Sequence, residues 1–230
     1  MENGVNGSGA GVPELTAAAF ESESLADRAY REIRDLIVML DIAPGSPINE
    51  DQLGSALGIG RTPIREALKR LAHERLVVAY PRRGTFATDV NITDLAHISE
   101  IRVHLEPIAA RSAAERATDQ QRAELQAILD ELSRPAAPRS ARELMLLDLR
   151  IHRSLYAAVH NAYLEDALIR YDNLANRIWC LFIDRLPDLA AHIAEHSPLL
   201  EAVIAGDSDR AAELAGKHVI HFEAEIRALI

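Results

Sequence analysis

The hydrophobic pattern of the chain begins at Ser24, where apolar residues start to recur every three or four positions, as on a helix with one buried face. Ser24 is suited to cap the N-terminus of this helix. The pattern ends near Leu40, and Pro44 and Gly45 break it. The preceding residues 1–23 are rich in Gly, Ala, Ser and Glu without any periodicity, so we expect a disordered tail there.

Two further helices are predicted, with a tight turn between them. Asn49 is suited to cap the first, and Gly58-Ile-Gly60 predicts the turn. Thr62-Pro63 supplies an N-cap and then a proline at the first helical position of the next helix, which runs to about Glu74.

A hairpin follows these helices. Pro81-Arg-Arg-Gly84 is a turn sequence between two strand-like segments, residues 76–80 and 85–88. Helix, helix, turn, helix and hairpin is the order of a winged helix-turn-helix. We therefore predict a DNA-binding domain of this type over residues 24–90.

The rest of the chain, residues 91–230, shows only helical periodicity. A mainly α protein is therefore predicted, with an antiparallel α-helical bundle behind the winged helix-turn-helix. The expected helices of this effector-binding and dimerisation domain are 93–116, 119–133, 140–160, 162–186, 189–205 and 208–229.

The net charge of −10 argues at first against a nucleic-acid partner, because phosphate binding depends on Lys and Arg. The charge is unevenly distributed, however. Between Gly58 and Gly84 seven basic side chains face two acidic ones, whereas residues 89–230 have fifteen basic and twenty-three acidic side chains. This asymmetry indicates a basic DNA-binding domain attached to an acidic sensor or dimerisation domain.

Composition limits the location of the protein and its cysteine chemistry. No apolar run approaches the roughly 20 residues of a membrane span, and the opening residues lack the features of a secretory signal. We expect a cytoplasmic protein without a membrane partner. Cys180 is the single cysteine, so any metal site must be built from His and carboxylates.

The third predicted helix has the residues of a DNA-recognition helix. Arg61 and Arg65 lie four residues apart near its N-terminus, where each could bind a guanine edge, and Thr62 could cap the helix or contact phosphate. Such arginines can also merely solvate a surface helix. The preceding helix, the tight turn and the basic hairpin favour DNA contact.

The hairpin tip offers a second DNA contact. Arg82 and Arg83 lie there beside Gly84, which has no side chain to hinder approach to DNA, so a wing in the minor groove is one interpretation. A charged surface turn explains these residues equally well.

A ligand cluster is predicted in the bundle. Asp148 and His152 lie one turn apart on a strongly apolar helix, where a buried carboxylate needs a cation or hydrogen-bond donors. His152 alone could satisfy Asp148 as an ion pair. With His196 and His218, these residues would form a set suited to zinc, nickel, cobalt or manganese. Four other histidines compete for these roles, and spacing does not choose among them: His104, His160, His192 and His221.

Two segments resemble a known family. Residues 48–71 together with Arg83-Gly-Thr-Phe86 are similar to the GntR-type regulators almost throughout. In the FadR-like members, the DNA contacts fall on positions that match Arg61, Thr62, Arg65 and Gly84. Some members have an arginine where this chain has Asp51, so the resemblance does not imply the operator sequence.

Residues 94–229 resemble the FCD type of ligand-binding domain. Asp148, His152, Glu195-His196 and His218 match its metal-binding pattern. The resemblance implies a divalent transition metal, zinc first, that holds a small carboxylate effector. Arg102 resembles an anchor for this carboxylate, and a surface or structural role explains it equally well.

The sequence therefore predicts a homodimeric repressor that binds an inverted-repeat DNA operator under control of the carboxylate. A regulator that senses the metal ion itself is the alternative. A metal-dependent hydrolase is a further alternative, but the chain lacks an H-E-x-x-H motif and an obvious general base, so we expect no enzyme.

Overall fold

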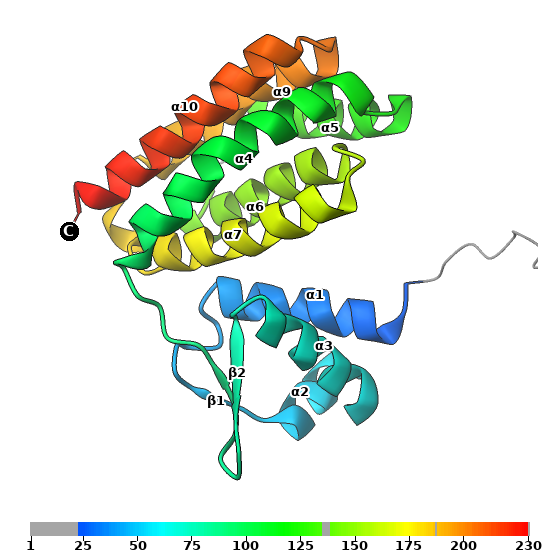
Figure 1. Ribbon diagram of the computed structural model, residues 1–230, viewed down its shortest axis with the longest axis vertical. Coiled ribbons are helices and arrows are strands. Elements are labelled where there is room, and N and C mark those ends of the chain that lie inside the picture. The colour runs from blue at the N-terminus through cyan, green and yellow to red at the C-terminus, as the bar shows by residue number, and fades with distance from the viewer. Residues whose placement is uncertain (1–22, 135–138, 187, 230) are drawn as a thin grey trace, which may run out of the picture.

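A computed structural model of the protein describes residues 23–134, 139–186 and 188–229. It consists of a small N-terminal part below a larger helical bundle, as Figure 1 shows. The expected tail, apart from Glu23, lies outside the described residues. The predicted fold class, a mainly helical protein with a winged helix-turn-helix, is confirmed.

The N-terminal part contains three helices and a three-stranded antiparallel sheet of order β1-β3-β2. Ser24 and Asn49 cap α1 and α2 as predicted, since their side chains accept backbone hydrogen bonds. Ile33, Ile64 and Leu71 are fully buried in its core. The elements are α1 (Leu25–Val38), β1 (Pro47–Ile48), α2 (Glu50–Leu57), α3 (Arg61–His73), β2 (Val77–Tyr80) and β3 (Gly84–Ala87).

Two local expectations for this part were wrong or incomplete. Gly60 is the N-cap of α3, and Thr62 lies inside the helix, so Thr62 is not the N-cap. Strand β1 was not predicted. It has only two residues, and it exists as a strand because Pro47 and Ile48 pair with Phe86 and Thr85 of β3.

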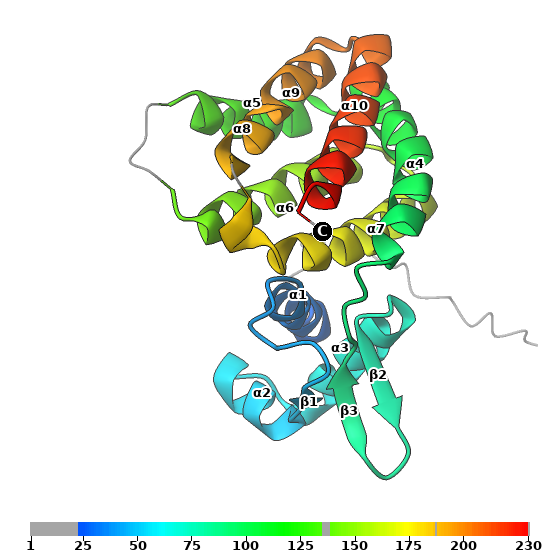
Figure 2. The same cartoon turned by 90° about the vertical axis from the view of Figure 1, so that its left-hand side faces the viewer.

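The regular elements described after β3 are all helical. Figure 2 shows the helices of the bundle arranged around a common interior, with α4 packed most extensively against α10 and also against α7. The elements are α4 (Asp94–Arg116), α5 (Asp119–Ser133), α6 (Ala141–Ala157), α7 (Ala162–Cys180), the 3-10 helix η1 (Ile183–Arg185), α8 (Leu189–Ala194), α9 (His196–Ala205) and α10 (Ser208–Arg227).

Two of the predicted bundle helices were too long. The helix expected over 162–186 ends at Cys180. The helix expected over 189–205 is broken at Glu195 into α8 and α9. Pro198 accounts for this break, because proline lacks an N–H for the carbonyl of Ala194 and its ring would clash with that carbonyl. The break gives Glu195 and His196 different surroundings.

The two parts meet along α1, which packs against α7 beneath the bundle (Figure 1). Two ion pairs join α6 to this region. Arg153 Nη2 lies 2.8 Å from Asp35 Oδ1, and Arg142 Nη2 lies 2.7 Å from Asp41 Oδ2. In the described part of the chain, every helix is too short or too polar to cross a membrane.

Candidate DNA-binding surface and metal centre

The N-terminus of α3 presents the predicted DNA contacts to solvent. Arg61, Thr62 and Arg65 are all exposed. Gly60 makes no side-chain cap, so backbone N–H groups at this end remain available to phosphate. Arg61 Nε lies 2.7 Å from Asp51 Oδ1, and Arg65 Nε lies 2.6 Å from Glu50 Oε2. Asp51 therefore contacts a predicted DNA-binding arginine directly.

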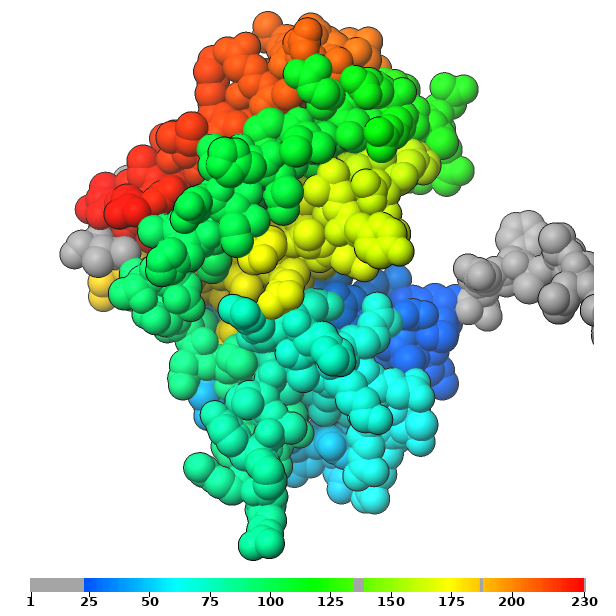
Figure 3. Space-filling model, viewed as in Figure 1, coloured from blue at the N-terminus to red at the C-terminus, as the bar shows by residue number. Residues whose placement is uncertain are grey.

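The β2–β3 hairpin forms a narrow wing that projects from the lower end of the molecule in Figure 3. Gly84 has a φ of +94°, a conformation that favours glycine, and Arg82 has a φ of +63°. The Arg83 guanidinium lies 5.5 Å from the ring centre of Tyr80. Arg82 and Arg83 are exposed at the wing tip.

The bundle brings the four predicted metal ligands together. Asp148 and His152 come from one face of α6, His196 from α9 and His218 from α10, and their ligand atoms lie within 4.8 Å of one another. We call these four residues the inner cluster. His196 Nε2 lies 3.3 Å from His152 Nε2 and 3.6 Å from Asp148 Oδ1. Metal bonds of about 2.0–2.2 Å place neighbouring ligand atoms about 3–3.5 Å apart, so the spacing fits a transition metal.

The second ring nitrogen of each histidine in this cluster has its own partner. His152 Nδ1 lies 3.1 Å from the Tyr156 hydroxyl, and His196 Nδ1 lies 3.1 Å from the Ile193 carbonyl. His218 Nδ1 lies 3.1 Å from Glu195 Oε2. If each Nδ1–H donates to its partner, every Nε2 keeps a lone pair for a metal, which is the arrangement of metal-binding histidines.

The protonation of these groups also suits a metal. Burial lowers the pKa of His196 to about 4 and lowers the pKa of His152 and His218 well below the usual value. The imidazoles are therefore neutral at pH 7 and able to bind metal. Burial raises the pKa of Asp148 well above its usual value. Asp148 Oδ1 has no hydrogen-bond partner among the described residues, so a bound cation would supply the contact that this buried oxygen lacks.

Arg102 lies close to the inner cluster but is already paired. Its Nε and Nη2 donate to Glu106 Oε1 at 2.9 and 2.8 Å, and Nη2 lies 3.2 Å from Asp172 Oδ1. The Tyr156 hydroxyl donates to the same Glu106 oxygen at 2.6 Å. Together with Asp148, this region buries three carboxylates against one guanidinium, and a divalent cation would balance the excess.

A cavity of about 10 Å³ lies beside His152 and His218, and Glu106 and Tyr156 form part of its wall. This is room for about one water molecule. A carboxylate metabolite would enter only if neighbouring side chains moved.

Four histidines left open by the sequence have different surroundings. His104 and His160 are exposed outside the inner cluster. His192 and His221 instead form a neighbouring group with Glu195. The sequence analysis assigned no role to Tyr156 or Glu106. Tyr156 lies one helical turn after His152, a spacing that could have indicated its contact with that ring.

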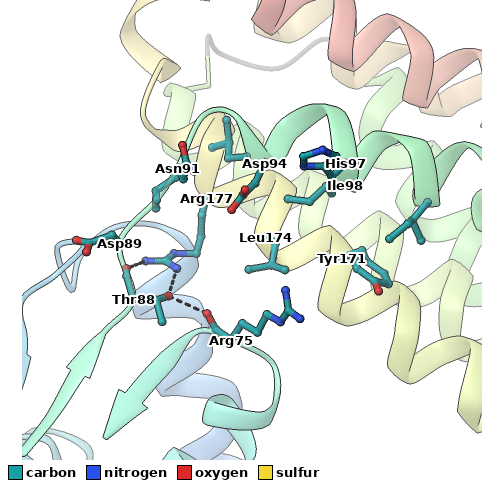
Figure 4. Close-up of a pocket in the computed structure, with 13 residues that line it drawn as sticks. Arg75, Thr88, Asp89, Asn91, Asp94, His97, Ile98, Tyr171, Leu174 and Arg177 are labelled. Carbon is teal, nitrogen blue, oxygen red and sulfur yellow. Dashed lines mark hydrogen bonds between the residues drawn. The ribbon is translucent and has the colours of Figure 1, made fainter. Parts of the chain in front are cut away.

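A pocket of about 490 Å³ lies between the two parts of the molecule. Figure 4 shows Arg177 of α7 reaching across it to the linker after β3. Its Nη1 donates to Thr88 Oγ1 at 2.7 Å and its Nη2 to the Thr88 carbonyl at 2.6 Å. Arg177 therefore ties the end of the wing to the bundle.

A winged helix-turn-helix joined to a helical domain of this kind defines a DNA-binding transcription regulator with a sensor-type domain. The family model described as bacterial regulatory proteins, gntR family, matches residues 25–87, and that of the FCD domain matches residues 97–221. The chain belongs to the GntR family and has an FCD domain, as its sequence motifs indicated. Both families consist of regulators, which confirms that the chain is not an enzyme.

Relatives of the chain extend over most of its length. The uncharacterized HTH-type transcriptional regulator YdhC of Bacillus subtilis is 28% identical over 204 residues, which cover 87% of this chain and 88% of the relative. The galactonate operon transcriptional repressor of Escherichia coli is 30% identical over 213 residues, which cover 82% and 91%. The structure of E. coli McbR/YncC has the same fold, with a TM-score of 0.74, 21% identity, and coverage of 90% of this chain and 99% of that one.

Proposed function

We propose that this chain is a homodimeric repressor that binds an inverted-repeat operator and is controlled by a small carboxylate bound at a metal centre. Residues 24–90 would form the DNA-binding domain, and residues 91–230 would bind the effector and dimerise. The established membership of the GntR family supports the first role. The inner cluster supports the second.

DNA contacts are proposed at two places. Arg61 and Arg65 would contact base edges in the major groove, and Thr62 would contact phosphate. Arg82, Arg83 and Gly84 of the wing would contact the minor groove or the backbone. The exposure of all six residues on α3 and the wing supports this assignment.

The observation that most supports a metal centre is the grouping of three buried imidazoles with Asp148. Each imidazole has a separate partner within hydrogen-bond distance of its Nδ1, and Asp148 Oδ1 has no hydrogen-bond partner among the described residues. Asp148, His152, His196 and His218 would hold the ion. The donor set suits zinc first, and nickel, cobalt or manganese also fit. When bound, the cation supplies a Lewis acid for a carboxylate oxygen of the effector.

The groups around the cavity would orient the rest of the effector. Tyr156 and Arg102 now donate hydrogen bonds to Glu106, so an entering carboxylate would have to share these donors or displace Glu106 from them. Arg102 would thus anchor the effector only after its contact with Glu106 changed. Such a change would move α4 relative to α6, which holds Tyr156.

Helix α6 offers a direct route from the metal centre to DNA binding. His152 faces the inner cluster, and the next residue, Arg153, forms the ion pair with Asp35 of α1 in the DNA-binding domain. A shift of α6 on effector binding would therefore move α1. In a dimer, such a shift would alter the spacing of the two recognition helices.

The variant Asp148→Asn tests the metal centre, because its effect on thermal stability relative to wild type should differ in sign without and with zinc. In chelated protein, loss of a buried carboxylate without a positive partner should leave the melting temperature unchanged or raise it. With free zinc at 100 times the dissociation constant, wild type should gain about 2.7 kcal/mol, and the variant should gain much less. Thermal unfolding with and without zinc measures both.

The matched control is Asp130→Asn, which changes an exposed carboxylate of α5 and should respond to zinc like wild type. An equal zinc response in Asp148→Asn and wild type would exclude the site. For the effector, a panel of small carboxylates is added to metal-loaded protein bound to a selected operator. If a carboxylate still releases Asp148→Asn protein from the operator, the effector binds elsewhere, for example in the pocket between the two parts of the molecule.

A further inference from the structure

We propose that a second, more exposed transition-metal site lies next to the inner cluster. It would be formed by His192 of α8, Glu195 at the break between α8 and α9, and His221 and Glu225 of α10. We call these four residues the outer cluster. None of them belongs to the inner cluster, so the proposal does not require that site to bind metal.

The outer cluster has the geometry of a ligand set. The ligand atoms of His192, Glu195 and His221 lie within 4.8 Å of one another. His192 Nδ1 lies 4.0 Å from Glu195 Oε2 and 3.1 Å from Glu225 Oε2. His221 Nδ1 contacts Glu195 Oε1, and its Nε2 lies 3.7 Å from Glu225 Oε1. The two separations from His192 Nδ1 bracket the roughly 3.3 Å between neighbouring ligands of a tetrahedral ion. His221 would bind the ion through Nδ1, which contacts Glu195, and its Nε2 would face Glu225.

His192 gives an independent indication of a missing ligand. Its side chain is fully buried, yet neither ring nitrogen has a hydrogen-bond partner among the described residues. The Trp179 ring packs against it, with centroids 4.2 Å apart and nearly perpendicular planes. The nearby Glu225 oxygen is close enough to Nδ1 but is not aligned for a hydrogen bond. A metal ion bound to Nδ1 would satisfy one of these two buried ring nitrogens.

The chemistry of the donors selects the class of ion. Two imidazoles and one or two carboxylates favour zinc and similar first-row ions over calcium or magnesium, which prefer oxygen ligands. Burial lowers the pKa of His192 to about 2, which leaves its ring neutral and able to bind such an ion. The two carboxylates then supply the charge that balances a divalent ion.

The two clusters differ in their access to solvent. Side chains of the inner cluster are at most 6% exposed, whereas those of His221 and Glu195 are 50% and 32% exposed. An ion in the outer cluster could keep water ligands and exchange with the solution more easily. Of the two sites, it is the one whose occupancy would follow the concentration of free metal, as a metal-sensing regulator requires.

Glu195 connects the two sites. Its Oε2 accepts the hydrogen bond from His218 Nδ1 of the inner cluster, and its Oε1 faces His221 of the outer cluster. A metal bound to Glu195 would weaken this carboxylate as an acceptor for His218, and second-layer hydrogen bonds of this kind tune metal affinity. Occupancy of the outer cluster should therefore change the metal affinity of the inner cluster. This last step rests on the proposed function, in which the inner cluster binds a metal.

The proposal is tested on full-length, tag-free protein. A chelator first removes bound metal, the protein is then dialysed to equilibrium against zinc, and metal analysis gives the number of ions bound per chain. Wild type should bind two zinc ions per chain, the weaker with the faster exchange. His221→Gln should bind one, because this half-exposed residue contributes to the outer cluster alone. Glu225→Gln should raise the dissociation constant of the weaker ion at least tenfold. His104→Gln, which alters an exposed histidine of α4, should still bind two.

A companion variant separates the two sites. His152→Ala should lose the inner ion and keep the outer one. The outer site is excluded if wild type binds a single ion and His221→Gln retains it. It is also excluded if wild type binds a single ion that both His221→Gln and His152→Ala lose. If the single ion is lost in His221→Gln but kept in His152→Ala, the outer site stands and the inner assignment fails. No bound zinc in wild type would overturn both. Circular dichroism and the melting temperature verify that each variant is folded.

Discussion

Two acidic side chains contact the arginines proposed to bind DNA. Asp51 and Glu50 at the start of α2 pair with Arg61 and Arg65 of α3. Exposed ion pairs of this kind contribute about 0–1 kcal/mol, so phosphate or a guanine edge can replace them. The acids hold the arginine side chains at the surface before DNA arrives. Asp51 also repels phosphate, so no phosphate contact is expected from its own side chain.

The arginines should differ in their effects on DNA binding. Arg61→Ala and Arg65→Ala should each weaken binding to a selected operator by about 1–3 kcal/mol and relax its specificity, because they would remove base contacts. Arg82→Ala should weaken operator and unrelated DNA alike and lower the salt dependence, as for loss of a phosphate contact. Fluorescence anisotropy at several salt concentrations measures both. Wild-type operator affinity in both recognition-helix variants would contradict this assignment.

At the scale of elements, α6 and α7 are the helices that link the sensor-type domain to the DNA-binding domain. Arg153 and Arg142 of α6 pair with acids in and just after α1, and Arg177 of α7 binds Thr88 after the wing. Burial lowers the pKa of Arg177 to about 10, so the guanidinium remains charged at pH 7. These contacts thus restrain the DNA-binding domain and its linker at three residues, Asp35, Asp41 and Thr88.

Helix α6 offers a matched pair of variants to test this link. Arg153→Met removes the pair with Asp35, whereas Arg150→Met removes a pair with Glu131 inside the bundle. If α6 relays the state of the metal centre, wild type should show a coupling of about 1–3 kcal/mol, or roughly 5- to 150-fold in operator affinity, between metal-loaded and chelated protein.

Arg153→Met should reduce this ratio severalfold, and Arg150→Met should leave it unchanged. Both variants should bind as much metal as wild type, because neither side chain is a ligand. Operator titrations with paired metal analysis measure the two quantities. An undiminished ratio in Arg153→Met would show that the coupling follows another route.

At the scale of the whole molecule, the charge is divided between the two ends. The basic residues of α3 and the wing lie at the lower end of the molecule, and the bundle above is acidic (Figure 1). Attraction to DNA is therefore concentrated on one end, and repulsion by the acidic bundle favours the orientation that presents α3. The net charge of −10 conceals this arrangement.

A single recognition helix reaches too few base pairs for useful specificity, so we expect two chains on each operator. Sedimentation should give twice the chain mass, and selection from random DNA should yield an inverted repeat whose half-sites are about one helical turn apart, or a multiple of it. A species of one chain mass, both free and on DNA, would exclude the homodimer. A direct repeat with two bound chains would instead exclude two-fold symmetry.

Most helices could be predicted from the sequence because their signals are local. The apolar period of α1 and the caps at Ser24 and Asn49 depend on residues within a turn of one another. The errors arose where a distant residue or an unusual break decided the outcome. Strand β1 depends on pairing with β3, about forty positions later, and Pro198 breaks a helix whose hydrophobic period continues through it.

The sequence by itself determined the family, the winged helix-turn-helix and the residues able to bind metal, because motifs and periodicity depend on neighbours along the chain. Only the tertiary structure decided how those residues group. Packing of α6, α9 and α10 brings His152, His196 and His218 together with Asp148, while α8 and the end of α10 place His192 and His221 in another group. Spacing could not separate these histidines, since contacts between helices depend on how the whole bundle packs.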